Sequence, residues 1–169
     1  MNRRKASKMN VGHEMPQNSE QKGIDAACAK SSDHWRILIV DDEQILREIW
    51  QDALQDEGYD VATAKDPEEA LKMLDSREFD LVLLDQVFKA SALNGLDALR
   101  EMNIRRYSAA VIMMTGYTDA EPNIVKAVRE GAYRHTIRKP STLTEIMEIV
   151  RNCLLERSRE TRESVAPEL

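Results

Sequence analysis

Short apolar runs alternate with amphipathic segments along the middle of this chain. Four of the runs occupy residues 37–40, 61–64, 81–84 and 110–114, and a weaker one occupies residues 136–137. Short runs that are apolar on both faces are typical of strands in a buried parallel sheet, because helices cover both sides of such a sheet. The pattern therefore predicts five strands in the interior of one domain.

The segments between these runs carry apolar residues at helical spacing. A first helix is predicted at residues 44–57, where two adjacent stripes are formed by Ile45, Ile49 and Ala53 and by Leu46, Trp50 and Leu54. A second helix begins at Pro67, and others are predicted at residues 96–103, 119–130 and 142–155. Strands that alternate with helices require parallel pairing and right-handed crossovers. The prediction is an α/β fold with a doubly wound five-stranded parallel sheet in a three-layer sandwich.

The two ends of the chain lack this alternation. Residues 1–34 are polar and aperiodic, so we expect a disordered leader. The ordered domain is predicted at residues 35–156, and residues 157–169 are expected to form a short flexible tail of mixed charge. That remainder is too short for a second domain, so we expect either a stand-alone unit or a fragment of a longer protein.

Composition narrows the classes of partner. The chain has 30 acidic and 24 basic residues and a formal net charge of −6, which argues against nucleic acid as a partner of this chain alone. No apolar run approaches the roughly 20 residues of a membrane span, and no secretory signal opens the chain. Cys28 and Cys153 form neither a metal-binding spacing nor a disulfide framework. We therefore expect a cytoplasmic protein with reduced thiols and no membrane partner.

Polar residues follow four of the five predicted strands. Asp41 and Asp42 follow the first strand, Asp85 the third, Thr115 the fourth and Lys139 the fifth. Each residue alone is an ordinary loop residue, but their joint occurrence is hard to obtain by accident. Ligands of doubly wound sheets bind beyond the carboxyl ends of the strands. These residues therefore mark the predicted site.

Three carboxylates at one sheet edge require a cation. At a separation of about 4 Å and an effective dielectric near 20, each pair costs about 4 kcal/mol. Hard oxygen ligands favour Mg²⁺, which keeps several waters and accepts phosphate oxygens as further ligands. Of Asp41 and Asp42, we expect one to bind the ion directly and the other through water. Asp85, at the centre of the sheet, is the predicted nucleophile for a phosphoryl group, and Lys139 and Thr115 would neutralise its oxygens.

Residues 36–156 resemble the receiver domain of bacterial two-component response regulators. The resemblance rests on Ile-Leu-Ile-Val-Asp41-Asp42-Glu43, Leu-Val-Leu-Leu-Asp85, Met-Met-Thr115-Gly116-Tyr117 and Lys139-Pro140, and on the spacing between these groups. It implies a flavodoxin-like sheet with strand order 2-1-3-4-5. It also implies a phosphorylation-dependent switch in a phosphorelay, which is not an enzyme, with a histidine kinase or phosphotransfer protein as the phosphoryl donor.

The resemblance assigns roles to individual residues. It implies that Asp85 is the phosphoacceptor, that Thr115 and Lys139 contact the phosphoryl group, and that Mg²⁺ is held by Asp41, Asp42, Asp85 and the backbone carbonyl of Val87. The last two strand–helix units would meet a downstream protein target or a second copy in a homodimer. That surface would include Ile124, Val128, Ile146 and Val150, although ordinary packing against the sheet explains most of these positions better.

Three features depart from the family pattern. The loop between Asp85 and Gly95 is longer than usual and lacks proline, so we expect it to be more mobile. The last strand carries Thr136 where the family has an aromatic switch residue, with His135 before it, so the predicted switch group is Thr115, His135 and Thr136. Val87 and Tyr117 would flank the phosphoryl group and exclude water. We therefore predict a long-lived phosphorylated state.

Two alternatives remain at this point. The chain could be a receiver-derived interaction module that works without phosphorylation, which the altered loop and the missing aromatic residue favour. It could also be a phosphatase of a related α/β fold. Such enzymes usually carry an Asp-x-Asp nucleophile motif after the first strand, and Asp41-Asp42-Glu43 lacks that spacing. Phosphorylation of Asp85 separates the first alternative from the switch, and turnover of a phosphate ester would support the second.

Overall fold

The computed structural model describes residues 35–116 and 135–165, with side chains as far as residue 160. The elements are β1 (Arg36–Val40), α1 (Gln44–Asp56), β2 (Asp60–Ala64), α2 (Pro67–Ser76), β3 (Leu81–Asp85), α3 (Gly95–Ile104), β4 (Ala110–Thr115), β5 (His135–Arg138) and α5 (Leu143–Val165). All strands pair in parallel in the order β2-β1-β3-β4-β5. The predicted five-stranded sheet and its flavodoxin-like order are confirmed.

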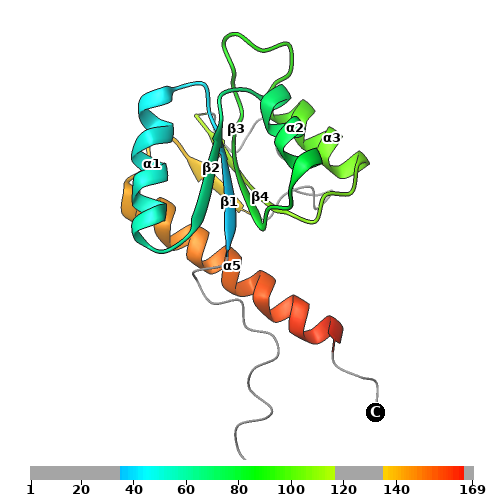
Figure 1. The fold of residues 1–169 in the computed structure, drawn as a ribbon. Helices are drawn as coiled ribbons and strands as arrows, with labels where there is room; N and C mark the ends of the chain where they lie inside the picture. The colour runs from blue at the N-terminus through cyan, green and yellow to red at the C-terminus, as the bar shows by residue number, and fades with distance from the viewer. Residues whose placement is uncertain (1–34, 117–134, 166–169) are drawn as a thin grey trace, which may run out of the picture.

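Helices cover both faces of this sheet. Figure 1 shows α1 and α5 on one face and α2 and α3 on the other. One core cluster joins Leu38, Val82 and Val111 to α2 and α3, while the other joins Ile39 and Ile112 to α1 and α5. Alternate strand residues thus point to opposite layers. The predicted three-layer sandwich is confirmed.

Local sequence signals fix where several helices begin. The Asp66 carboxylate accepts a hydrogen bond from the Glu69 amide at 2.7 Å, and Pro67 occupies the first turn of α2. Asn94 and Asp97 form a reciprocal capping box at the start of α3. These caps satisfy amides that have no partner inside the helix, so each helix starts at a defined residue after its loop.

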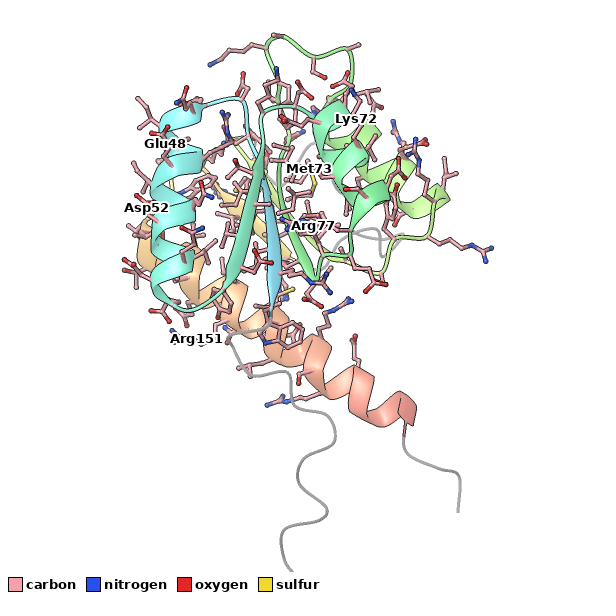
Figure 2. All side chains as sticks on the ribbon, in the orientation of Figure 1. Glu48, Asp52, Lys72, Met73, Arg77 and Arg151 are labelled. Atoms are coloured by element: carbon pink, nitrogen blue, oxygen red, sulfur yellow. The ribbon has the colours of Figure 1, made fainter. Side chains whose placement is uncertain are left out.

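The two apolar stripes of α1 have different environments. Trp50 and Leu54 are buried and Leu46 packs beside them, whereas Ile45 is 71% exposed and Ile49 is 48% exposed. Figure 2 shows Glu48 and Asp52 on the outer side of α1. Only one stripe can face the sheet because successive helical residues are rotated by about 100°.

Helix α5 runs beyond the predicted end of the domain. Its helical backbone continues to Val165, past residue 156, where the sequence pattern ends the domain, and the flexibility of residues 157–169 stays a prediction. Residues 157–165 contain neither glycine nor proline and are rich in Arg and Glu, which favour helix. The Arg157 guanidinium also donates a hydrogen bond to the backbone carbonyl of Ser108. Figure 1 shows α5 projecting past the edge of the sheet.

Some sequence predictions fall outside the described residues. These are the leader at 1–34, the helix at 119–130 with Ile124 and Val128, and the last residues, 166–169. On α5, Ile146 and Val150 are buried, in keeping with ordinary packing against the sheet. Within residues 35–116 and 135–165, no helix combines the length and apolar character that a membrane span requires.

Candidate functional site

Three aspartates meet at the carboxyl ends of β1 and β3. The register pairs Val40 with Leu84, so Asp41 and Asp85 leave neighbouring strands at the same edge. One carboxylate oxygen each from Asp41, Asp42 and Asp85 lies within 4.8 Å of the others. Asp41 and Asp85 are buried, and Asp42 is partly exposed. The structure therefore brings together the three acids that the sequence singled out.

Lys139 reaches this cluster from the end of β5. Its ammonium group donates hydrogen bonds to Asp41 Oδ2 at 2.7 Å and to Asp85 Oδ2 at 2.9 Å. The Lys139 amide donates to the Thr115 carbonyl at 2.8 Å, which fixes the start of its side chain beside β4. The ammonium group also lies 5.6 Å from the centre of the Trp50 ring. Lys139 thus bridges two acids from different strands.

Backbone amides hold three further carboxylate oxygens of the cluster. Asp41 Oδ1 accepts from the Glu43 amide at 2.8 Å, and Asp85 Oδ1 accepts from the Gln86 amide at 2.7 Å. Asp42 Oδ2 accepts from the Lys89 amide at 3.1 Å. Each acid therefore has a fixed orientation.

Burial and neighbouring charges shift the pKa of Asp85 and that of Lys139. Burial raises the pKa of Asp85, and the nearby Lys139 ammonium opposes that shift only in part. Burial alone would lower the pKa of Lys139, but hydrogen bonds and charges from Asp41 and Asp85 outweigh it and raise the pKa. Lys139 is therefore cationic at neutral pH. One ammonium group faces three carboxylates, which leaves negative charge at the site.

The donor set fits a hard divalent cation. The three clustered groups offer carboxylate oxygens only, and excess negative charge favours a cation among them. Val87, the predicted fourth ligand through its carbonyl, lies in the loop after Asp85 with its side chain 44% exposed. Oxygen ligands with this charge suit Mg²⁺ better than zinc.

Sequence similarity identifies the family of this site. A family model for the response regulator receiver domain matches residues 37–151. The chain belongs to this family. Receiver domains are the phosphorylation-dependent switches of two-component systems, they bind Mg²⁺ at an acidic pocket, and they interact with histidine kinases and downstream targets.

A curated response regulator is similar to this chain in sequence. The nitrogen assimilation regulatory protein NtrX of Azorhizobium caulinodans is 35% identical over 129 residues, which cover 75% of this chain and 28% of NtrX. The match thus spans only about a quarter of the length of NtrX.

Solved receiver structures have the same fold. A CheY-like receiver domain protein from Methanospirillum hungatei matches with a TM-score of 0.67 and 30% identity, over 75% of this chain and 98% of that one. The response regulator TrrA from Thermotoga maritima, solved in complex with Mg²⁺ and BeF, matches with a TM-score of 0.60 and 32% identity, over 70% of this chain and 98% of that one.

Gln86 is a site residue that the sequence analysis missed. The residue immediately follows Asp85 and is buried. Its side-chain oxygen accepts a hydrogen bond from the Thr115 hydroxyl, and Thr115 is also buried. A glutamine after a strand carries no distinctive sequence signal, so only the folded arrangement of β3 and β4 reveals the contact.

The long loop after Asp85 is attached at several points. Phe88 is buried, the Lys89 ammonium lies 3.8 Å from the Glu43 carboxylate, and the Ser91 hydroxyl donates to Glu68 at 2.8 Å. At the end of the loop the Gly95 amide donates to the Gln86 carbonyl at 3.0 Å. The loop therefore contacts the segment between β1 and α1, and it contacts α2, beside the acidic cluster. Its predicted mobility stays a prediction.

The two predicted switch residues of β5 lie on opposite sides of the strand. His135 Nε2 lies 3.1 Å from a carboxylate oxygen of Glu156 on α5. Thr136 pairs with Met113 of β4 and, as the next residue, points to the other layer. Tyr117, predicted to flank the phosphoryl group, lies outside the described residues. His135 therefore faces α5, and the side chain of Thr136 faces the opposite layer.

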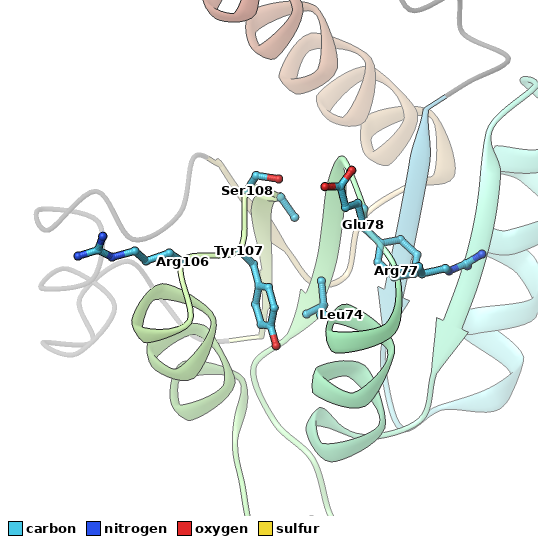
Figure 3. Close-up of a pocket in the computed structure, with 8 residues that line it drawn as sticks. Leu74, Arg77, Glu78, Arg106, Tyr107 and Ser108 are labelled. Carbon is cyan, nitrogen blue, oxygen red and sulfur yellow. The ribbon is translucent and has the colours of Figure 1, made fainter.

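A separate cavity lies at the other edge of the sheet. About 260 Å³ in volume, it is lined by residues of the turns that enter β3 and β4, among them Phe79, Tyr107 and Ala109. Figure 3 shows the guanidinium groups of Arg77 and Arg106 pointing away from Tyr107 and Leu74. The cavity stands apart from the acidic cluster, which lies at the carboxyl ends of the strands.

Proposed function

We propose that Asp85 accepts a phosphoryl group from a histidine kinase or a phosphotransfer protein. The observation that carries this proposal is the shared contact of Lys139 with the buried carboxylates of Asp41 and Asp85. This arrangement joins a nucleophilic carboxylate, a fixed cation and two further acids at one sheet edge. It matches the charge pattern that phosphoryl transfer needs.

The reaction is a substitution at phosphorus. A carboxylate oxygen of Asp85 forms a P–O bond while the P–N bond to the donor histidine breaks, and the imidazole keeps that electron pair and takes a proton from solvent. Lys139 keeps its charge throughout because Asp41 and Asp85 raise its pKa. The Thr115 hydroxyl and the Lys139 ammonium then contact the phosphoryl oxygens.

Asp41, Asp42, Asp85 and the backbone carbonyl of Val87 are the proposed Mg²⁺ ligands. When bound, Mg²⁺ neutralises the carboxylates and the oxygens of the incoming phosphoryl group. The carboxylates are already oriented by the amides of Glu43, Gln86 and Lys89. Because their orientation is already fixed, these carboxylates would hold the ion with little rearrangement.

The proposed output is a change in the surface formed by the last two strand–helix units. Thr115 lies in β4, and its carbonyl is bonded to the Lys139 amide beyond β5, so a movement of Thr115 reaches the next strand directly. His135 and Thr136 are the proposed neighbours in this switch. A downstream protein or a second copy would bind the changed surface in the cytoplasm, without nucleic acid, membrane or enzymatic turnover by this chain.

Intact-mass spectrometry after incubation with acetyl phosphate and Mg²⁺ tests the proposal. Wild type is expected to gain the mass of one phosphoryl group, and Asp85→Asn is expected to gain none. Asp80→Asn is the matched control, because Asp80 is a buried aspartate next to the opposite end of β3. It should become phosphorylated as wild type does.

The negative outcomes have distinct meanings. An adduct that survives Asp85→Asn would assign the acceptor to another residue. No adduct on wild type or on Asp80→Asn, with the fold intact by circular dichroism, would favour an interaction module that works without phosphorylation.

A further inference from the structure

Gln86 contacts both the predicted acceptor and the predicted switch hydroxyl. Its backbone amide donates to Asp85 Oδ1 at 2.7 Å, while its side-chain oxygen accepts the hydrogen bond of the Thr115 hydroxyl. Both hydrogen bonds are buried. Gln86 therefore links the end of β3 to the end of β4 through a polar side chain in the core.

The backbone of Gln86 is held on both sides. Its amide also lies 3.0 Å from the Met114 carbonyl, and its own carbonyl accepts from the Gly95 amide at 3.0 Å. Burial of the side chain further restricts its rotamers. The amide oxygen is thus a fixed acceptor next to Thr115, rather than a loop group that happens to be near it.

A threonine hydroxyl has a single hydrogen to donate. While it donates to Gln86, it cannot donate to an oxygen of a phosphoryl group. We propose that Gln86 holds the Thr115 hydroxyl in the unphosphorylated state, and that Thr115 must exchange the amide oxygen for a phosphoryl oxygen when the switch turns on. This inference rests on the proposed phosphorylation of Asp85.

The exchange makes Gln86 a positioning residue that acts through Thr115. Loss of the amide oxygen removes a contact made only in the off state, so the on state becomes more populated. A single hydrogen bond of ordinary net strength changes such an equilibrium by about three- to tenfold. A phosphoryl group, or a mimic of it, should then bind more tightly by that factor.

The test uses Gln86→Met, which keeps the length of the side chain and removes the strong acceptor. Beryllofluoride with Mg²⁺ serves as the phosphoryl mimic, and tryptophan fluorescence measures its affinity. Trp50 is a suitable probe because Lys139 lies 5.6 Å from its ring. The background substitution Trp35→Phe leaves Trp50 as the single tryptophan, because the chain has 2. Gln86→Met is expected to bind beryllofluoride about three- to tenfold more tightly.

A double-mutant cycle separates this role from a structural one. In a Thr115→Val background there is no hydroxyl to hold, so Gln86→Met should change the affinity by less than about twofold. The same gain in both backgrounds would show that Gln86 acts without Thr115 and would overturn the proposal. Circular dichroism and urea unfolding confirm that each variant is folded.

The failures of the two proposals can be told apart. If wild type gains no phosphoryl group and binds no beryllofluoride, the proposed function fails and the exchange fails with it. If wild type does both and folded Gln86→Met binds the mimic with unchanged or weaker affinity, only the exchange is overturned. Mg²⁺ affinity is measured without the mimic as well, because the Gln86 amide contacts Asp85. A gain in Mg²⁺ affinity as large as the gain for beryllofluoride would show that Gln86 acts through the metal ligands, and it would overturn the exchange.

Discussion

Charged groups have different environments at the two edges of the sheet, where the strands end and where they begin. At the carboxyl edge, the buried pair Asp41 and Asp85 share one ammonium group, that of Lys139. At the amino edge, Asp75 accepts hydrogen bonds from the Tyr107 hydroxyl and, at 2.8 Å, from Arg105; Asp75 and Arg105 are exposed and Tyr107 is partly buried. The hydrogen bond from Tyr107, with help from Arg105, lowers the pKa of Asp75, whereas burial raises that of Asp85.

This difference separates an ordinary surface ion pair from an arrangement that favours a functional role. At the amino edge a negative group meets its donors in water, so little is gained or lost. At the carboxyl edge negative charge is buried in excess of its partner, which costs stability. In the proposed function this cost has a purpose, because the carboxylates hold a cation and Asp85 attacks phosphorus.

Removal of the cationic side chain at each edge should give the largest difference in the free energy of unfolding. Lys139→Met leaves buried carboxylates without their ammonium partner, and we expect it to lower the free energy of unfolding by about 3 kcal/mol without Mg²⁺. Arg105→Met, the control at the other edge, should change it little because its partners are exposed. Urea unfolding measures both. Equal losses would contradict the distinction between the two edges.

A methyl group placed beside the acceptor should have the next largest effect. A Cβ atom on Gly95 would lie 2.1 Å from the Asp85 carbonyl oxygen, so the backbone must shift. Gly95→Ala is expected to cost about 2 kcal/mol of unfolding free energy and to slow phosphorylation.

Gly116→Ala is the matched control for this substitution. A Cβ atom there meets nothing within 4 Å among the residues that the structure describes, and the stability should change by less than about 0.5 kcal/mol. Thermal unfolding and acetyl phosphate kinetics report the two properties. A Gly95→Ala protein as stable as Gly116→Ala would mean that the backbone next to Asp85 yields easily.

The pH dependence should show the smallest effect, in opposite directions at the two edges. Because the folded pKa of Asp85 is raised, its contribution is fully present below the ordinary aspartate value and is lost as pH rises through the folded pKa. Between about pH 4 and neutrality, Asp85→Asn should therefore gain stability relative to wild type without Mg²⁺. For Asp75 the lowered pKa reverses the sign, and its contribution is lost as pH falls. Urea unfolding at a series of pH values measures both contributions. If the free energy of unfolding depended on pH in the same way for wild type and Asp85→Asn, the prediction for Asp85 would be refuted.

Sequence patterns predict much of this molecule because they reflect local and topological rules. Apolar runs and helical spacing predict the strands and their parallel pairing, and the resemblance to receiver domains implies the strand order. The fold then brings Asp41, Asp42, Asp85 and Lys139 to one edge. Those residues could be found because parallel strands must end together.

Other features depend on which side chains meet after folding. Both stripes of α1 are apolar, and only packing decides that Ile45 stays exposed while Trp50 is buried. Likewise, the contact of Gln86 with Thr115 and that of His135 with Glu156 join residues far apart in the chain. The extension of α5 past Glu156 follows from helix propensity without an apolar stripe, which periodicity does not detect.

The close contact between Gly95 and the Asp85 backbone has a mechanical consequence. Packed protein interiors compress very little, so a contact with no spare space transmits displacement instead of absorbing it. The end of β3 and the first turn of α3 should therefore move as one rigid body, with the loop between them anchored at both ends. A backbone displacement at Asp85 can then be passed on in two directions: to the loop at residues 86–94, or across the sheet to β4.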